Sequence, residues 1–128
     1  MIIADLWIQK NEQKHKEAVL FLHGHAGAGP EGHDLVCAGV SALAGALGSA
    51  VERMDQNGML LDMPDVNLLK GYALIQAAPK EEFLDAVLMA FWTIQNGLAE
   101  LAEQYPENIE LVQTLRVEQE EEGEEASA

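Results

Sequence analysis

The sequence has a single cysteine and few basic residues, and both scarcities exclude classes of protein. Because Cys37 is the only cysteine, the chain cannot form an internal disulfide or a CxxC motif, and it has no resolving thiol of its own. Only 7 lysines and arginines stand against 22 aspartates and glutamates, which gives a formal charge of −15. A field of that sign repels phosphate backbones and anionic lipids, so we expect no direct binding to nucleic acid or to a membrane.

The given sequence also shows no targeting pattern and no long hydrophobic run. No basic stretch followed by an apolar stretch opens the chain, so we expect no signal peptide and a cytoplasmic protein. The longest uncharged run, Leu35 to Val51, has seventeen residues and contains three glycines and two serines. That length and composition favour a buried core helix over a membrane span.

The 128 residues fit one domain, and an apolar share of 48% is enough for a packed core. We expect this domain to cover residues 1–117. The remaining residues, 118–128, include six glutamates and cannot bury apolar surface, so we expect a disordered acidic tail. Without those six charges, −15 becomes −9, and the domain itself is therefore acidic.

The first half of the chain predicts a hairpin, a loop and a helix. Residues 2–9 are rich in strand-forming types, and residues 17–23 form a continuous apolar run that is typical of a central strand covered on both faces. Residues 24–33 contain four glycines and a proline, which indicates a long loop. Asp34 is a good N-cap for a helix from Leu35 to about Met54.

The second half predicts the same order of elements. We expect short strands at about 59–63 and 68–77, separated by Pro64 and Asp65, then a helix that opens at Pro79. This helix extends to about Gln104, and a last strand follows over 109–117. The order ββα-ββα-β predicts an α+β fold, an α/β sandwich with a mixed β-sheet of about five strands and two main helices.

Most residues capable of chemistry lie close to Cys37 in the sequence. With Asp34 as the N-cap, Cys37 takes the third helical position, where amides without helical acceptors favour a thiolate. A thiolate near an imidazole is typical of nucleophilic acyl transfer. A lone cysteine among small residues is also a common packing residue, and spacing alone does not choose among His23, His25 and His33.

Two other kinds of site use the same stretch. The three histidines and Cys37 could supply four ligands to a tetrahedral metal, but their spacings match no standard zinc module, and we expect no metal. Residues 27–32, GAGPEG, satisfy the dinucleotide-binding pattern GxGxxG. The predicted helix begins after the third glycine and Glu31 places an anion where pyrophosphate would lie, so we expect no cofactor.

Residues 24–43, GHAGAGPEGHDLVCAGVSAL, resemble the signature of the ribosomal-processing cysteine protease family, Prp. That signature is approximately G-H-A, a short glycine-containing loop, and D-[IV]-V-C-A-x-V-S-x-L. The resemblance implies that Cys37 is the nucleophile and His25 the base. It further implies supporting positions at Gly24, Asp34 and Ser41, and a flexible loop over the site that contains Gly27, Gly29 and Gly32.

The resemblance also implies what such a protein does. Members of the Prp family are cytoplasmic, homodimeric endopeptidases. They remove the N-terminal extension of a large-subunit ribosomal protein, the one that reaches toward the peptidyl-transferase centre. The implied partner is therefore a ribosomal protein precursor. Two alternatives remain: a non-catalytic ribosome-associated or assembly protein of the same fold, whose cysteine would react no faster than a free thiol, and a small metal-binding protein, which would purify with zinc.

Overall fold

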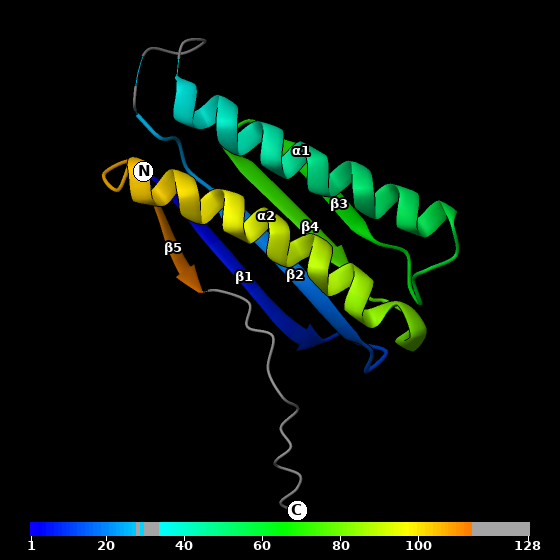
Figure 1. Ribbon diagram of the computed structural model, residues 1–128. Coiled ribbons are helices and arrows are strands. Elements are labelled where there is room, and N and C mark those ends of the chain that lie inside the picture. Colours follow the sequence, from blue (N-terminus) through cyan, green and yellow to red (C-terminus); the bar gives the residue numbers. More distant parts are fainter. Residues whose placement is uncertain (28, 30–33, 114–128) are drawn as a thin grey trace, which may run out of the picture.

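Two α-helices pack against one face of a five-stranded mixed sheet. The computed structural model describes residues 1–27, 29 and 34–113. Within them the order ββα-ββα-β is confirmed, and so is the α+β class (Figure 1). The elements are β1 (Ile2–Lys10), β2 (Lys16–His23), α1 (Leu35–Gln56), β3 (Asp65–Leu69), β4 (Tyr72–Ala77), the 3-10 helix η1 (Glu81–Phe83), α2 (Leu84–Gln104) and β5 (Ile109–Gln113).

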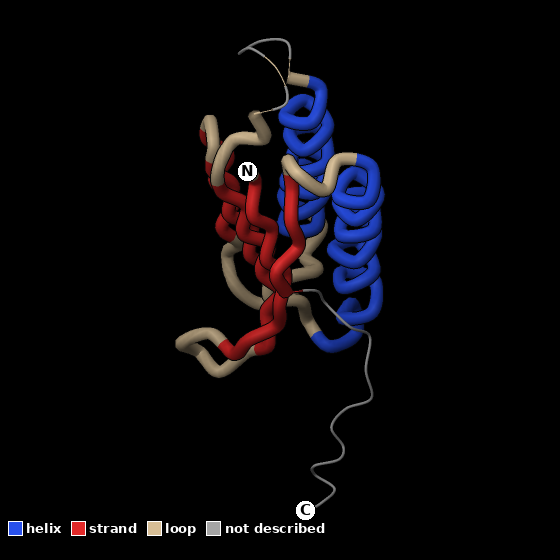
Figure 2. The backbone as a smooth tube through the Cα atoms, turned by 90° about the vertical axis from the view of Figure 1, so that its left-hand side faces the viewer, coloured by secondary structure: helices blue, strands red, loops and turns tan. Residues whose placement is uncertain are grey.

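The sheet has the strand order β3-β4-β2-β1-β5, in which β1 and β5 are parallel and the other neighbours antiparallel. β2 is central, as predicted, but the expectation that both its faces are covered was wrong, because both helices lie on one side of the sheet (Figure 2). Val19 on the other side is fully buried between its register neighbours Trp7 and Gln76. The apolar run therefore reflects flanking strands as well as the helical layer.

The core lies between the sheet and the helices. Every second residue of a strand faces the helices, and every third or fourth residue of a helix faces back, so one interior forms from two periodicities. α1 is the one described helix that is long and apolar enough to cross a membrane, and here it packs on the sheet. The largest fully buried side chains are Phe91, Leu20, Leu47, Ile75, Leu98 and Ile109.

The structure corrects three predicted boundaries. The strand expected at 59–63 was wrong, since only Leu60 forms a bridge there, to Pro79, and β3 begins after Pro64. The strand expected over 68–77 is divided by a turn at Gly71, which has φ +73°. The second helix begins with the 3-10 turn and becomes α-helical at Leu84, later than predicted. Residues 114–117 of the predicted last strand and the predicted acidic tail lie outside the described residues.

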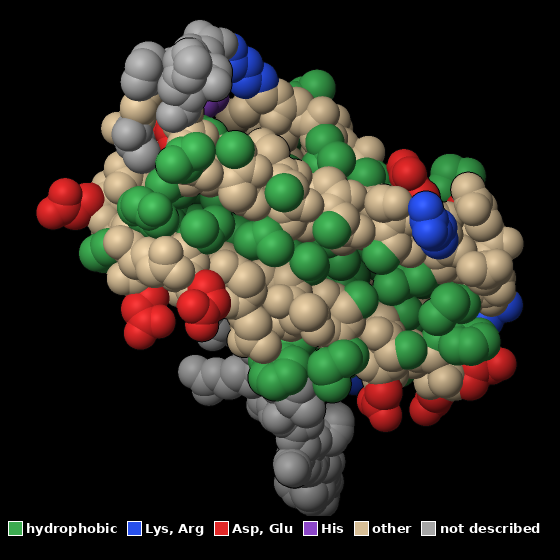
Figure 3. Space-filling model, turned by 45° about the horizontal axis from the view of Figure 1, so that its top comes forward, with side chains coloured by type: hydrophobic (Ala, Val, Ile, Leu, Met, Phe, Trp, Pro, Cys, Tyr) green, Lys and Arg blue, Asp and Glu red, His purple; other side chains and the backbone are tan. Residues whose placement is uncertain are grey.

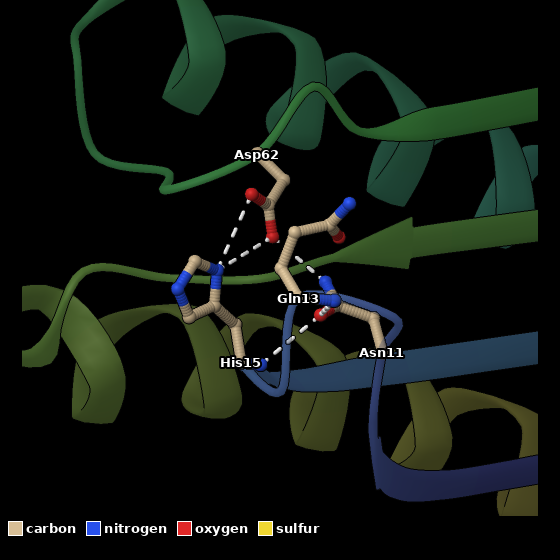
Figure 4. Close-up of polar contacts among 4 residues, drawn as sticks. All are labelled: Asn11, Gln13, His15 and Asp62. Atoms are coloured by element: carbon tan, nitrogen blue, oxygen red, sulfur yellow. Dashed lines mark hydrogen bonds and ion pairs between the residues drawn. The ribbon is translucent and has the colours of Figure 1, made fainter.

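A cluster of polar side chains closes the end of the sheet where β2 begins (Figure 4). The Asn11 Oδ1 atom accepts hydrogen bonds from the amides of Gln13 and His15, at 2.9 and 3.0 Å. The Asn11 Nδ2 atom donates to Asp62 at 2.7 Å, and the His15 Nδ1 atom lies 3.0 Å from the same carboxylate oxygen. These contacts join the turn between β1 and β2 to the segment before β3.

Candidate active site

Cys37 lies in the first turn of α1, and Asp34 fixes the start of that helix. Asp34 has an extended backbone, and its Oδ1 atom accepts a 3.0 Å hydrogen bond from the Cys37 amide. The Asp34 carbonyl also accepts one from the Ala38 amide, at 3.0 Å. Asp34 is therefore the N-cap, as the sequence predicted. It occupies the amide of Cys37, so this amide is not free to receive an oxyanion.

The Cys37 sulfur accepts a hydrogen bond from the loop that precedes the helix. The donor is the Ala26 amide, 3.3 Å from Sγ, and the Ala26 side chain is buried with 3% exposure. On its other side, the Ala26 carbonyl accepts a 2.9 Å hydrogen bond from the Asn108 Nδ2 atom. A chain of two hydrogen bonds thus connects the sulfur to the start of β5. No pattern in the sequence indicated this role for Asn108, which lies 82 residues from its partner.

A groove of about 550 Å³ opens beside the half-buried thiol. The loop after β2, the first turns of α1 and the hairpin of β3 and β4 form its walls. Residues 68–72 of that hairpin were not predicted, because nothing in a local pattern indicates which distant turn packs against a loop. Of the predicted site residues, the groove brings together Gly24, His25, Gly27, Gly29, Asp34, Cys37 and Ser41.

His25 lines the groove, and its ring lies against the hairpin of β3 and β4. A Cβ atom built on Gly71 would lie 2.7 Å from the His25 Nε2 atom, so the exposed imidazole rests on the turn between β3 and β4. The Gly24 amide donates a 3.0 Å hydrogen bond to the Gly71 carbonyl and holds the loop to the same turn. Among the described residues, no hydrogen bond joins His25 to Cys37, so the catalytic roles of both stay predictions.

The structure also bears on the other candidates from the sequence. His23 lines the groove as well, and its ring stacks on Phe21 with centroids 5.0 Å apart. Gly32 and His33 lie outside the described residues, as does most of the GxGxxG pattern. In the part of the chain that the structure describes, no three side chains of histidine, cysteine, aspartate or glutamate gather as a metal site would require.

These parts have a common chemistry. A thiol at the start of a helix, a backbone amide directed at its sulfur and a histidine in the same groove are the components of acyl transfer by a nucleophilic cysteine. The fold and the site therefore define an α+β protein of the thiol hydrolase class. The family model described as cysteine protease Prp matches residues 1–110 of the chain. The chain belongs to this family, and it is a cysteine protease.

Solved structures agree with the family assignment. The essential ribosomal processing protease Prp from S. aureus, in complex with a covalently linked product peptide, is 28% identical with a TM-score of 0.65, over 91% of this chain and 100% of that one. In complex with a substrate peptide it matches at 25% identity and a TM-score of 0.60, over 89% and 100%. SMU.848 from Streptococcus mutans is 26% identical with a TM-score of 0.61, over 91% and 96%. No curated protein sequence matches the chain.

Proposed function

We propose that the chain is a cytoplasmic endopeptidase that removes the N-terminal extension of a large-subunit ribosomal protein. The observation that carries the proposal is the Cys37 sulfur, which lines a groove of about 550 Å³ and accepts a hydrogen bond from the Ala26 amide. The similar S. aureus protease is a ribosomal processing enzyme whose structures hold substrate and product peptides. A chain of formal charge −15 also attracts a basic ribosomal protein.

In the proposed reaction, the Cys37 sulfur attacks the scissile carbonyl carbon. A carbon–sulfur bond forms, the carbon–nitrogen bond breaks, and water then hydrolyses the acyl-enzyme to regenerate the thiol. His25 takes the thiol proton and returns a proton to the leaving amine. Ser41, one turn after Cys37 along α1, lies on the same groove and would contact the bound peptide.

His25 must leave Gly71 to reach the sulfur, and the glycines on either side of it allow this motion. Gly24 has φ +102° and Gly27 has φ +71°, and a Cβ atom at Gly27 would meet nothing within 4 Å. Glycine passes between such conformations without the strain that other residues would suffer. We therefore infer that a bound peptide displaces the imidazole from the hairpin and aligns it with Cys37.

The test uses the full chain and a peptide that spans the extension of the host's own ribosomal protein. Intact-mass spectrometry follows cleavage by the wild type and by Cys37→Ser, His25→Ala and the matched control His15→Ala, which lies at the other end of the sheet. We expect one cut by the wild type and the control, and a loss of at least about 100-fold in the other two. Cleavage that survives in Cys37→Ser would refute the thiol mechanism. No cleavage by any folded form would favour the non-catalytic ribosome-associated protein.

We also infer that the chain forms a homodimer through its helical layer. No charged residue occurs from Leu35 to Val51 in α1 or from Ala86 to Ala99 in α2, and Figure 3 shows acidic side chains at the rim of this face. Two copies of an acidic chain repel each other least where they carry no charge. Sedimentation equilibrium should give twice 13.9 kDa, and Ala42→Glu, at an exposed position of α1, should give the monomer. A monomeric wild type would contradict the inference.

A further inference from the structure

We propose that Asn108 is a positioning residue for Cys37, because its side-chain amide holds the Ala26 backbone in the orientation that directs the Ala26 N–H at the sulfur. This role rests on the proposed function of Cys37 as a nucleophile. Asn108 itself does not line the groove. It would therefore act without touching the peptide substrate, through the backbone of Ala26, whose carbonyl accepts from Asn108 and whose amide donates to the sulfur.

The anchor is rigid because the Asn108 backbone is fixed from two directions. Its amide donates a 2.9 Å hydrogen bond to the Tyr105 carbonyl at the end of α2, and its carbonyl accepts one of 2.9 Å from the Ile2 amide at the start of β1. The Nδ2 atom that reaches the Ala26 carbonyl thus projects from a point where a helix and two strands meet.

The loop needs such an anchor. Ala26 follows His25 and lies between Gly24 and Gly27, both of which have positive φ. Because glycine lacks a Cβ atom, the backbone around Ala26 changes conformation more easily than a segment without glycine. If His25 moves when a peptide binds, the neighbouring Ala26 amide would move with it unless something else held it. The hydrogen bond from Asn108 and the burial of the Ala26 methyl group together hold Ala26 in place while His25 moves.

The amide matters because of what it does to the sulfur. A hydrogen-bond donor favours a thiolate over a thiol, since the anion is the stronger acceptor. The thiolate is the nucleophile. With Asn108 in place, the Ala26 N–H is therefore held where it can stabilise negative charge on the attacking sulfur. Without it, the donor is free to turn away.

The test measures the rate of Cys37 alkylation by iodoacetamide against pH in the full chain. Asn108→Ala removes the side chain, and Asn108→Asp keeps its shape but replaces the donor with an acceptor. Asn67→Ala, at an exposed position of β3, is the matched control. Among the described residues, the other titratable groups that line the groove are unchanged in every variant: His23, His25, Asp34, Lys70 and Tyr72.

We expect the alkylation profile of both Asn108 variants to move to higher pH by about one unit relative to the wild type and the control. Cleavage of the ribosomal peptide should lose kcat while KM stays unchanged, because the bound peptide makes no contact with Asn108. Circular dichroism confirms that each variant is folded. Unchanged profiles in folded variants would overturn the proposal.

A second measurement does not depend on variants that fold. In the wild type, the NMR signal of the Ala26 amide should shift as the single thiol titrates, and its hydrogen exchange should be slow. Fast exchange and no shift would refute the contact on which the proposal depends. Alkylation does not use the peptide, so a shifted profile with no cleavage by the wild type would refute the protease and leave the positioning role intact.

Discussion

At the scale of the residue, the glycines of the site differ in what their missing side chain does. Gly27 has open space around it, so its absent Cβ provides freedom of motion. A Cβ at Gly24 would instead collide with the Met1 carbonyl, and the Gly24 amide is already bonded to Gly71. The resemblance implied that Gly24 is a supporting position of the site. In this structure it also allows two backbones to approach closely.

We predict that Gly24→Ala destabilises the protein by about 2 kcal/mol or more, because both the positive φ and the collision with Met1 oppose a methyl group. The matched control is Gly45→Ala in the interior of α1, where a Cβ would meet nothing within 4 Å. That change should stabilise the protein by about 0.5–1 kcal/mol, since alanine favours a helix. Urea unfolding compares the two, and equal stability of Gly24→Ala and the wild type would contradict this account.

Residues near Cys37 were predictable because their relations are local. Asp34 stands three residues before the thiol, at the predicted start of the helix, and was therefore expected to be its N-cap. The structure contains the capping hydrogen bond from the Cys37 amide to Asp34. Asn108 was not predictable, because a side chain that meets a backbone carbonyl 82 residues away leaves no periodic trace in a single sequence. The same holds for the hairpin residues that complete the groove.

At the scale of the element, the sequence predicted the number, type and order of helices and strands, and failed at the edge of the sheet. The apolar types at 59–63 resembled a strand, yet Leu61 and Met63 are exposed by 47% and 87% and only Leu60 is buried. β3 is an edge strand that pairs with β4 alone. An edge strand keeps much of its surface in water, so its alternation is weak and its boundaries are hard to predict.

At the scale of the molecule, the two ends of the sheet differ. One end carries the candidate active site, and the other carries a cluster of polar side chains. The groove lies where β2 ends, and the cluster of Asn11, His15 and Asp62 lies where β2 begins (Figure 4). Hydrogen bonds from His15, the larger effect, and from Asn11 hold the pKa of Asp62 below the usual range of an aspartate. At each end, contacts join segments that are far apart in the sequence.

This shift makes a prediction about stability and pH. A carboxyl whose pKa is lowered by folding stabilises the native state above its unfolded pKa, about 4, and loses that contribution as pH falls through the folded value. Asp62→Asn should therefore be less stable than the wild type at pH 7, and the difference should vanish in strong acid. The pair is partly exposed, so we expect less than about 1 kcal/mol. Urea unfolding at several pH values measures it, and a constant difference would contradict the role.

The bond between Asn108 and Ala26 also has a consequence for how the protein is made. A ribosome adds the loop long before it adds the residue that anchors it, and the parallel pairing of β1 with β5 waits for the same late segment. Neither contact can form before that segment has been synthesised, and pairings between distant segments are slow to form. A chain still being translated therefore contains Cys37 before Asn108 is present to bind the Ala26 carbonyl. The site around Cys37 is therefore complete only when nearly all of the domain has left the ribosome.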